Sequence, residues 1–510
     1  MSVEPVFISG CYIVKDEEEL LGASLEAVRP FVDEIVVYDT GSSDDTVAVA
    51  RAHGARVVEG YWDDHFGDAR NRALEHCRGG WVLAVDADEV AQGNPGAWRR
   101  SLRDTAADCC VVEITSRPWG DAGRVRRAMV PRVLRRGWTR WEGGLHERIV
   151  PLRPGPGLVA NPHLQLRHYG YTASRIVERD KHRRNVEIAE RELAQALASG
   201  GPGPVELWLN VGRSACAAGQ HERALEAFST VRQLGPVPAL GILAAHSAVR
   251  SALARDDVAL ASSWLVSMRA WGEGPEVCRA VEGRIALAAG DLERAESLLR
   301  RVQDGTDYQG LRFEAASSRD HLVECLVRQG RVEDAAAILV PHVASGASNK
   351  HPRDVLTLLG QVPGAVRQLV EQLPADLETP FVGQLKDCAA ETTSTFYEEM
   401  WRGQRAPVLV LAAVSRQWSS LPFEEALVWS LRLRERGLAG HCPLRRMLVD
   451  ADRDTRTRAL SGAVLVEVGE TDVLPDLEPV LGDVDADEAA PLLAELRRVA
   501  PSFSRTLEPA

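Results

Sequence analysis

The sequence predicts an α/β domain with a mostly parallel, Rossmann-like sheet, followed by a solenoid made only of helices. Over the first third of the 510 residues, short apolar runs alternate with helical segments. This pattern is typical of a parallel sheet with helices on both faces. From about residue 172 the character changes to helix, with glycines and small residues at repeated spacings. The length also predicts more than one domain, because single cores stop growing near roughly 250–300 residues.

Four apolar runs give the predicted strands of the first domain, residues 6–14, 34–38, 55–59 and 80–85. The acidic segment after the first run, residues 15–19, is expected to open a helix, because the helix dipole favours carboxylates in a first turn. Gly41 can turn the chain after the second strand, and another helix is expected to start at Gly67. No GxGxxG follows the first strand and no GxxxxGKS or GxxxxGKT occurs. A dinucleotide-binding or P-loop domain would therefore lack its phosphate cradle.

Three carboxylates follow the fourth predicted strand within four residues, in the run Asp86-Ala87-Asp88-Glu89. Open α/β sheets bind ligands at the carboxyl edge of their strands. Like charges this close repel, and a divalent cation with phosphate oxygens as further ligands would relieve the repulsion. The run therefore indicates a metal–diphosphate site, with a solvated acidic loop as the alternative.

A single carboxylate, Asp39, follows the second predicted strand. It can accept a hydrogen bond from a ribose hydroxyl or a base N–H. The alternative is that Asp39-Thr40-Gly41-Ser42 is turn chemistry alone.

Four motifs occur in order along this domain: Ile13-Val14-Lys15-Asp16-Glu17, Asp39-Thr40-Gly41-Ser42-Ser43-Asp44-Asp45-Thr46, Phe66-Gly67-Asp68-Ala69-Arg70-Asn71 and Asp86-Ala87-Asp88-Glu89. In this order they resemble the family 2 glycosyltransferases, over roughly residues 5–175. The resemblance implies a GT-A fold, a nucleotide-sugar donor and a Mg²⁺ or Mn²⁺ ion.

The resemblance also implies roles for individual residues. Asp39 would contact the nucleoside with Asp45 close by, and Arg70 would lie near the nucleotide. Asp86 would touch the ribose or the metal, and Asp88 would bind the metal. One departure is Asp16, where many relatives carry Asn after Lys.

Arginines gather between residues 124 and 148, including Arg124 and Arg132, and the planar guanidinium suits diphosphate recognition. The run Trp141-Glu142-Gly143-Gly144-Leu145-His146-Glu147 resembles a motif of the peptide-glycosylating branch of the family, the glycocin S-glycosyltransferase kind. An inverting transfer needs a base for the acceptor proton. Glu147 is the first candidate and His146 the second, and the alternative for Glu147 is an ion pair with an arginine.

A further strand is predicted over residues 164–171, and it presents His168. In GT-A enzymes a late histidine often completes the metal site, so the resemblance implies that His168 is a metal ligand. Imidazole suits Mn²⁺ better than Mg²⁺. A structural histidine is the alternative.

A repeat with a period of about 34 residues runs through the helical region and matches the tetratricopeptide pattern. Its first copy carries Trp208, Gly212, Gly219, Ala224, Phe228 and Pro236. The predicted domains are a transferase domain (1–172), a linking helix (173–203), tetratricopeptide-like repeats (204–345) and a C-terminal helical region (346–510). Stacked helix pairs commonly hold a peptide or another subunit, and the alternative is a scaffold for the enzyme domain or a homodimer.

The composition narrows the class of protein. The formal net charge of −13 disfavours nucleic acid and anionic membrane surfaces as partners. No stretch of about 18 apolar residues predicts a membrane span, and the N-terminus has no secretory pattern. Nine unpatterned cysteines favour reduced thiols in a cytoplasm.

Together these observations predict a metal-dependent, inverting glycosyltransferase that moves a hexose from a UDP-sugar to a peptide or protein side chain, through sulfur or oxygen. Two alternatives stay open. One is transfer to a saccharide or secondary metabolite, and the other is a non-catalytic repeat scaffold with a degenerate transferase domain.

Overall fold

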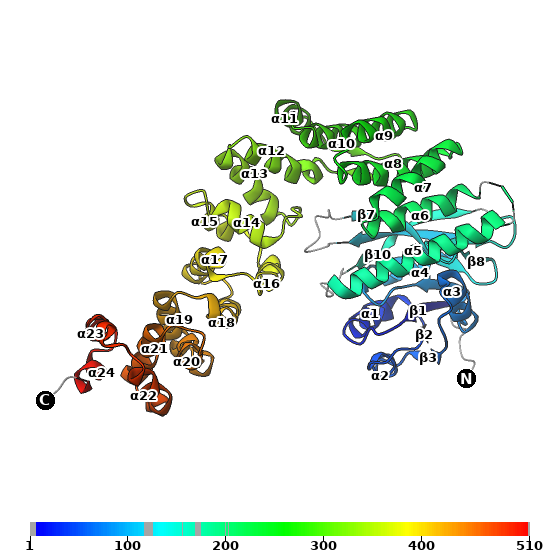
Figure 1. The fold of residues 1–510 in the computed structure, drawn as a ribbon. Coiled ribbons are helices and arrows are strands. Elements are labelled where there is room, and N and C mark those ends of the chain that lie inside the picture. The colour runs from blue at the N-terminus through cyan, green and yellow to red at the C-terminus, as the bar shows by residue number, and fades with distance from the viewer. Residues whose placement is uncertain are drawn as a thin grey trace. The chain divides into compact units, whose positions relative to one another are not determined.

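The computed structural model describes residues 7–116, 126–155, 157–168, 175–198, 200–201 and 203–507. The chain divides into two compact units, Met1–Gln329 and Gly330–Ala510. The first unit contains the sheet domain and the first repeated helix pairs, and the second is built of helices (Figure 1). The predicted domain boundaries at residues 172, 203 and 345 stay predictions.

An eight-stranded sheet forms the centre of the first domain, in the order β3-β2-β1-β4-β7-β6-β10-β5. Strands β3, β2, β1 and β4 are mutually parallel, as are β6 and β10, whereas β7 and β5 run antiparallel to their neighbours. The strands are β1 (Ile8–Val14), β2 (Glu34–Asp39), β3 (Arg56–Glu59), β4 (Trp81–Ala84), β5 (Glu89–Gly93), β6 (Cys109–Ser116), β7 (Arg126–Arg135) and β10 (Leu158–His168). The four predicted strands and the predicted GT-A fold class are confirmed.

Successive side chains of the strands enter the two cores on opposite faces of the sheet, as strand geometry requires. On β1, Tyr12 and Val14 belong to one core and Cys11 to the other. The helices that cover the sheet are α1 (Leu21–Val28), α2 (Thr46–Ala52), α3 (Phe66–Glu75) and α4 (Pro95–Asp104).

The helix expected at residues 15–19 begins later, at Leu21. The acidic segment forms a loop instead, because the loop after β2 supplies partners for its backbone. The amide of Glu17 donates to Thr46 Oγ1 at 2.7 Å, and the amide of Glu18 donates to Asp44 Oδ2 at 3.1 Å. These contacts between distant loops outweigh the favourable position of carboxylates in a first helical turn.

A small hairpin, β8 (Thr139–Glu142) and β9 (Arg148–Pro151), lies against the N-terminus of α3. The amides of Phe66 and Gly67 donate to the carbonyls of Gly144 and Gly143 at 2.9 and 3.0 Å. A Cβ at Gly67 would lie 2.7 Å from the Gly143 carbonyl oxygen, so a glycine is needed there. The hairpin loop, residues 143–147, is therefore held on the first turn of α3.

Helix pairs follow the sheet domain, as the tetratricopeptide pattern predicts. After the long helix α5 (Arg175–Ala198) come α6 (Val205–Ala217), α7 (His221–Gln233), α8 (Pro238–Leu253), α9 (Val258–Ala270), α10 (Pro275–Ala288), α11 (Leu292–Arg300) and α12 (Arg319–Arg328). Within the first three pairs the chain turns through a left-handed residue, Gly219, Asp256 or Gly290. A short hairpin, β11 (Gly305–Thr306) and β12 (Arg312–Phe313), precedes α12.

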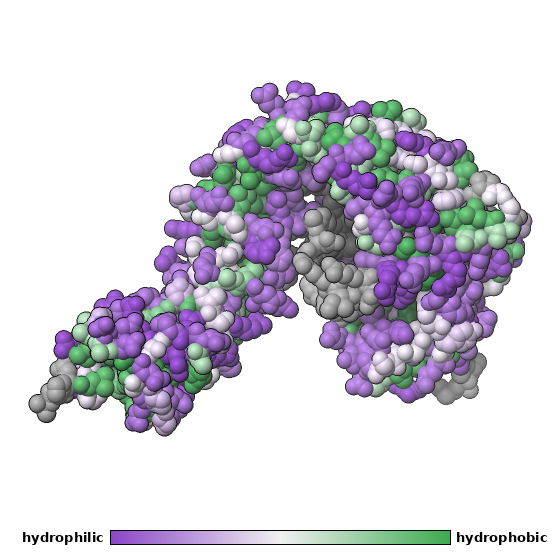
Figure 2. Space-filling view, in the orientation of Figure 1, coloured by the Kyte–Doolittle hydropathy of each residue, from purple (hydrophilic) through white to green (hydrophobic). Residues whose placement is uncertain are grey.

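The second unit continues with helices throughout its described residues. They are α13 (Val332–Ala344), α14 (Pro352–Leu359), α15 (Ala365–Gln372), α16 (Ala375–Gly383), α17 (Ala390–Arg402), α18 (Pro407–Arg416), α19 (Phe423–Glu435), α20 (Pro443–Val449), α21 (Thr455–Glu467), α22 (Leu474–Gly482), α23 (Ala486–Val499) and α24 (Pro501–Thr506). No helix among the described residues has the length and apolar character that crossing a bilayer requires. On the face drawn in Figure 2, hydrophilic residues surround small hydrophobic patches.

Gly212 tests the packing inside the first repeat. A Cβ at this position on α6 would lie 2.4 Å from the Phe228 ring of α7. We expect Gly212→Ala to lower the free energy of unfolding by about 1–3 kcal/mol through overpacking. Gly96→Ala is the control, because its Cβ on α4 would meet atoms at ordinary contact distances of 3.5 Å. Urea denaturation measures both variants, and equal stabilities would contradict the close approach of α6 and α7.

Candidate active site

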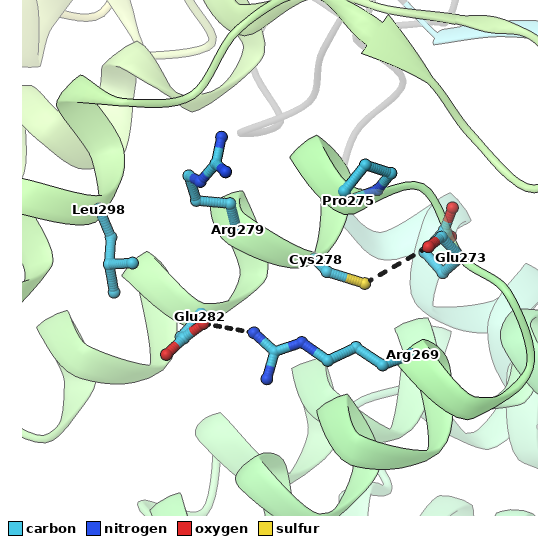
Figure 3. Close-up of a pocket in the computed structure, with 7 residues that line it drawn as sticks. All are labelled: Arg269, Glu273, Pro275, Cys278, Arg279, Glu282 and Leu298. Atoms are coloured by element: carbon cyan, nitrogen blue, oxygen red, sulfur yellow. Dashed lines mark hydrogen bonds and ion pairs between the residues drawn. The ribbon is translucent and has the colours of Figure 1, made fainter.

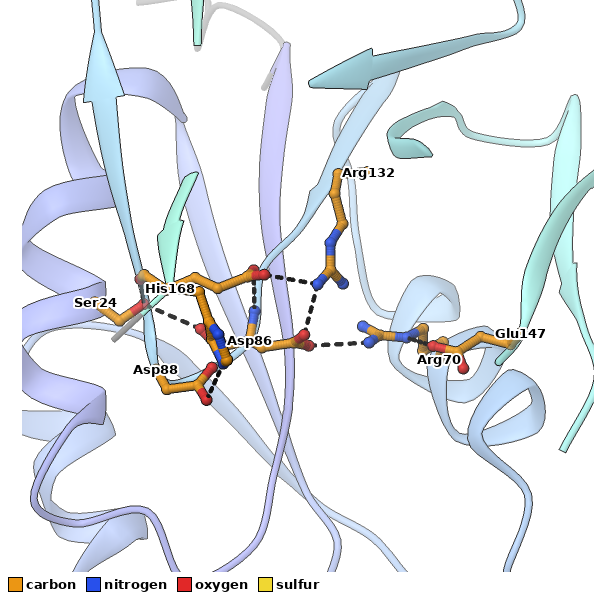
Figure 4. Close-up of polar contacts among 8 residues, drawn as sticks. Ser24, Arg70, Asp86, Asp88, Arg132, Glu147 and His168 are labelled. Carbon is orange, nitrogen blue, oxygen red and sulfur yellow. Dashed lines mark hydrogen bonds and ion pairs between the residues drawn. The ribbon is translucent and has the colours of Figure 1, made fainter. Parts of the chain in front are cut away.

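Strand register brings the acidic run and His168 to the same place (Figure 4). Asp86 and Asp88 lie in the turn between β4 and β5, and Glu89 begins β5. Strand β10 pairs antiparallel with β5, with His168 opposite Glu89. Two segments about 80 residues apart in the sequence therefore meet at one point of the sheet edge.

Two guanidiniums hold Asp86. Arg70 of α3 donates to Asp86 Oδ1 at 2.9 Å, and Arg132 of β7 donates to Asp86 Oδ2 at 2.6 Å. Although burial opposes ionisation, the charges of Arg132 and Arg70 hold the pKa of Asp86 far below its usual value. Asp86 is therefore a carboxylate whose two oxygens are both engaged. Arg132 belongs to the arginine cluster singled out in the sequence, whereas Arg124 lies outside the described residues.

Glu89 is the buried member of the acidic run, and its side chain is only 2% exposed. Its carboxylate accepts from Arg132 at 2.7 Å and from the Asp86 amide at 2.9 Å. Burial raises the pKa of Glu89 to about 7, with Arg132 opposing this shift. The Ser24 hydroxyl of α1 donates to the Glu89 carbonyl at 2.6 Å. Glu89 thus fixes the turn that presents Asp86 and Asp88.

Asp88 points toward His168 instead of the arginines (Figure 4). The Asp88 Oδ2 and His168 Nε2 atoms are 2.7 Å apart, and this hydrogen bond to the carboxylate raises the pKa of His168. Among the described residues, Asp88 forms no ion pair with an arginine. The two proposed metal ligands are therefore adjacent.

A divalent ion at this place needs oxygen or nitrogen ligands. Within the described part of the chain, no three His, Cys, Asp or Glu side chains form a metal-ligand group. Asp88 and His168 offer one oxygen and one nitrogen, which suits Mn²⁺ when phosphate and water supply the other positions.

The proposed nucleoside residues lie at the same edge, since β1, β2 and β4 are parallel. Both oxygens of Asp39 are engaged in its own turn, where they accept from the Gly41 amide and from the amide and hydroxyl of Ser42. Asp45 is exposed at the start of α2. Asp16, which has a left-handed backbone, accepts from the Ser43 amide at 2.7 Å. Turn chemistry therefore accounts for Asp39 in this structure, and its contact with a nucleoside stays a prediction.

Arg70 also binds the candidate base. Its Nε donates to Glu147 Oε1 at 2.5 Å, while its Nη2 donates to Asp86. The guanidinium lies 5.1 Å from the centre of the Trp141 ring, and the Asn71 side chain makes two hydrogen bonds of 2.9 Å to the Trp141 backbone. The Arg70-Asn71 motif thus joins the acidic run to the hairpin loop. The ion pair that was the alternative for Glu147 is present, and a role as base stays a prediction.

His146 occupies a left-handed position in the hairpin loop, with φ of 53°. Its side chain is solvent-accessible but crowded by protein, and this crowding together with the charge of Arg213 lowers the pKa of His146. A base works best with a pKa near the working pH. The lowered pKa makes His146 a weaker base than an ordinary histidine side chain.

Helices of the repeat region support the hairpin loop from outside the sheet domain. Glu192 of α5 accepts from the Gly144 amide at 2.5 Å, and Asn210 of α6 donates to the Leu145 carbonyl at 3.1 Å. The Leu145 side chain packs in a core with Ile188 and Val211. Sequence reasoning missed Glu192 and Asn210, because neither lies in a motif.

Removing Arg132 tests the charge network. In Arg132→Met, Asp86 and Glu89 lose a shared partner in a poorly hydrated site, so we expect the free energy of unfolding to fall by about 3 kcal/mol. The matched control is Arg140→Met, whose exposed ion pair with Glu142 should contribute less than about 1 kcal/mol. Urea denaturation distinguishes them. A loss for Arg132→Met no larger than for the control would show that the network does not stabilise the fold.

Comparison with known proteins shows which proteins this domain is similar to. Residues 11–168 match the model of Glycosyl transferase family 2. A TPR repeat-containing protein of Synechococcus elongatus is 34% identical over 195 residues, which are 37% of this chain and 48% of that protein. The glycosyltransferase SunS of Bacillus subtilis is 28% identical over 193 residues, which are 36% of this chain and 44% of that protein.

Among solved structures, glucosyl-3-phosphoglycerate synthase from Mycobacterium tuberculosis, in complex with Mn²⁺ and UDP, is 27% identical with a TM-score of 0.19. The match covers 22% of this chain and 44% of that structure. The chain spans about half or less of the length of these relatives. Residues 11–168 are thus similar to the family 2 glycosyltransferases, and tetratricopeptide-like helix pairs follow them in the chain.

Proposed function

We propose that this chain is a metal-dependent glycosyltransferase that moves a sugar from a UDP-sugar to a side chain of a peptide or protein, with inversion at the anomeric carbon. The observation that carries the proposal is the position of Arg70. One buried guanidinium contacts both Asp86, at the predicted donor end, and Glu147, the candidate base. The distance between donor and base is thereby set by a single side chain.

Asp88 and His168 are the residues that would hold Mn²⁺ or Mg²⁺. When bound, the ion would supply positive charge for the diphosphate as it leaves the sugar. Asp39 and Asp45 would lie on the nucleoside side, and Arg70 near the nucleotide. The ion pairs of Asp86 with Arg70 and Arg132 hold the turn that carries Asp88 in place before any ligand binds. Such preorganisation lowers the cost of reaching the reactive geometry.

Glu147 would act on the acceptor. Its Oε1 is held by Arg70, and Figure 4 shows the second carboxylate oxygen directed away from that guanidinium. This oxygen would take the proton from an acceptor hydroxyl or thiol. The acceptor atom then bonds to the anomeric carbon as the bond from that carbon to the diphosphate oxygen breaks, which releases the nucleoside diphosphate. A single displacement of this kind inverts the configuration.

Two features support a peptide as the acceptor. The run Trp141 to Glu147 resembles the peptide-glycosylating branch of the family. The loop that ends this run is held by α5 and by α6 of the first repeat, so Glu147 lies close to the repeat region. A surface of stacked helix pairs commonly binds an extended peptide.

Asp88→Asn tests the metal and the donor together. Wild-type protein should show a Mn²⁺-dependent rise in melting temperature with UDP, and a smaller one or none with GDP and dTDP, because ligands that bind only the native state stabilise it. Asp88→Asn should lose this rise while it melts normally without ligand. Asp104→Asn, an exposed change at the end of α4, is the control. A full UDP response in Asp88→Asn would refute the metal assignment.

Glu147→Gln tests the base. The amide oxygen can still accept from Arg70, so the loop should keep its position and the variant should bind UDP with unchanged affinity. Turnover of an acceptor should fall by about 10²–10⁴-fold, the usual contribution of a general base. The measurement is kcat alongside the affinity for UDP. If UDP binding is lost and turnover of the bound donor is kept, Glu147 belongs to the donor site and is not the base.

A further inference from the structure

Three arginines occupy equivalent positions on the first helices of three successive repeats. Arg213 of α6, Arg250 of α8 and Arg284 of α10 each stand six residues before the left-handed residue that ends the turn, which is Gly219, Asp256 or Gly290. Because the repeats stack, equivalent positions form a row across neighbouring first helices. We call these three residues the arginine track.

Packing sets the direction in which the arginine track faces. Gly212 and Gly283, the residues before two of its members, lie against Phe228 and Leu299 of the paired second helices. The next residue along a helix is rotated by about 100° from that contact. The arginines therefore lie away from the interface with the second helices.

The members of the arginine track are close to one another. The Arg250 guanidinium reaches across to α6, where its Nη2 and Nε lie 3.0 and 3.2 Å from the Cys216 sulfur. Cys216 is three residues beyond Arg213, which is about one helical turn on the same side of α6. The charge of Arg250 also lowers the pKa of Arg213 and of Arg284, in each case after the larger effect of burial.

No carboxylate among the described residues forms an ion pair with Arg213, Arg250 or Arg284. Other arginines in the same repeats do pair with glutamates, for example around the cavity of about 390 Å³ among α9, α10 and α11 (Figure 3). There Arg269 pairs with Glu282, and the neighbouring Arg279 pairs with Glu276. Arg213 and Arg284 are half-buried and Arg250 is exposed. Guanidiniums held near each other without counter-ions form a site for an anion.

The arginine track begins beside the hairpin loop. Asn210, which donates to the Leu145 carbonyl at 3.1 Å, lies one helical turn before Arg213 on α6. At its far end, Glu324 of α12 occupies the fourth equivalent position, six residues before Gly330. The negative charge of Glu324 raises the pKa of Arg284, against the larger lowering by burial. The cationic stretch therefore spans three repeats, starting at the loop that carries Glu147.

We infer that the arginine track binds an acidic stretch of the acceptor peptide and guides it to the loop that carries Glu147. The inference rests on the proposed function. Neighbouring helices pack with axes about 8–10 Å apart, and an extended chain advances about 3.3 Å per residue. Acidic side chains about three residues apart would thus meet successive arginines. Nucleic acid is a poorer match, because three cations on a chain of net charge −13 offer few phosphate contacts.

The experiment measures peptide binding by the full chain. The probe is a fluorescein-labelled peptide of about 12 residues with glutamate at every third position, long enough to span the arginine track in an extended form. Wild-type protein should bind it, and the triple variant Arg213→Gln, Arg250→Gln, Arg284→Gln should bind it at least about tenfold more weakly, given three charge contacts. Raising the salt concentration should weaken only the wild-type interaction strongly.

The matched control removes the same charge elsewhere. Arg255, Arg294 and Arg300 are exposed and each pairs with a glutamate. The triple Gln variant at these positions should bind the peptide as wild type does. Equal losses in both triple variants would overturn the inference, as would tighter binding of a lysine-for-glutamate peptide or of a single-stranded oligonucleotide.

Donor binding separates this inference from the proposed function. The Mn²⁺-dependent UDP response should be the same in the wild type and the track variant, because the arginine track contacts none of the proposed donor residues. If the UDP response is present but the acidic peptide does not bind, the inference fails and the proposed function stands. If the wild type shows no UDP response, the proposed function fails.

Discussion

The ion pairs of Asp86 with Arg70 and Arg132 connect the acidic run to the other elements around it. They join the end of β4 to α3 and β7, and through Arg70 to Glu147 on the hairpin loop. Buried ion pairs add little stability compared with apolar packing, but removing one partner is costly. The network therefore specifies one arrangement of the acidic run. Asp86 and Glu89 form ion pairs with arginines, and Asp88 contacts His168.

The strands and helices of the sheet domain could be predicted because their signals are local. Apolar runs such as residues 80–85 specify a strand through residues that are neighbours in the sequence. The start of α1 was mispredicted for the opposite reason, since the partners of Glu17 and Glu18 come from residues 44–46. Likewise Glu147 could be singled out by resemblance, but its partner Arg70 is 77 residues away and only the fold shows the pair.

The repeat region shows the same limit. Its period could be predicted from glycines and small residues. One turn, however, has Asp256 where the pattern expects glycine. The sequence alone therefore does not show that Arg250 is equivalent to Arg213 and Arg284. The contacts of Glu192 and Asn210 with the hairpin loop carry no sequence signal at all. Single polar residues on helices are common, and only the tertiary structure shows that these two contact residues 144 and 145.

The hairpin loop is clamped between α3 on one side and α5 and α6 on the other. The sheet domain is therefore not an interchangeable module. A chain cut ahead of α5 would leave the Gly144 amide and the Leu145 carbonyl without their partners, and would expose the Leu145 side chain that packs on Ile188 and Val211. A fusion of this domain to the repeats of another protein would also need the residues of α5 and α6 that contact the hairpin loop. A transferable unit therefore includes α5 and the first repeat.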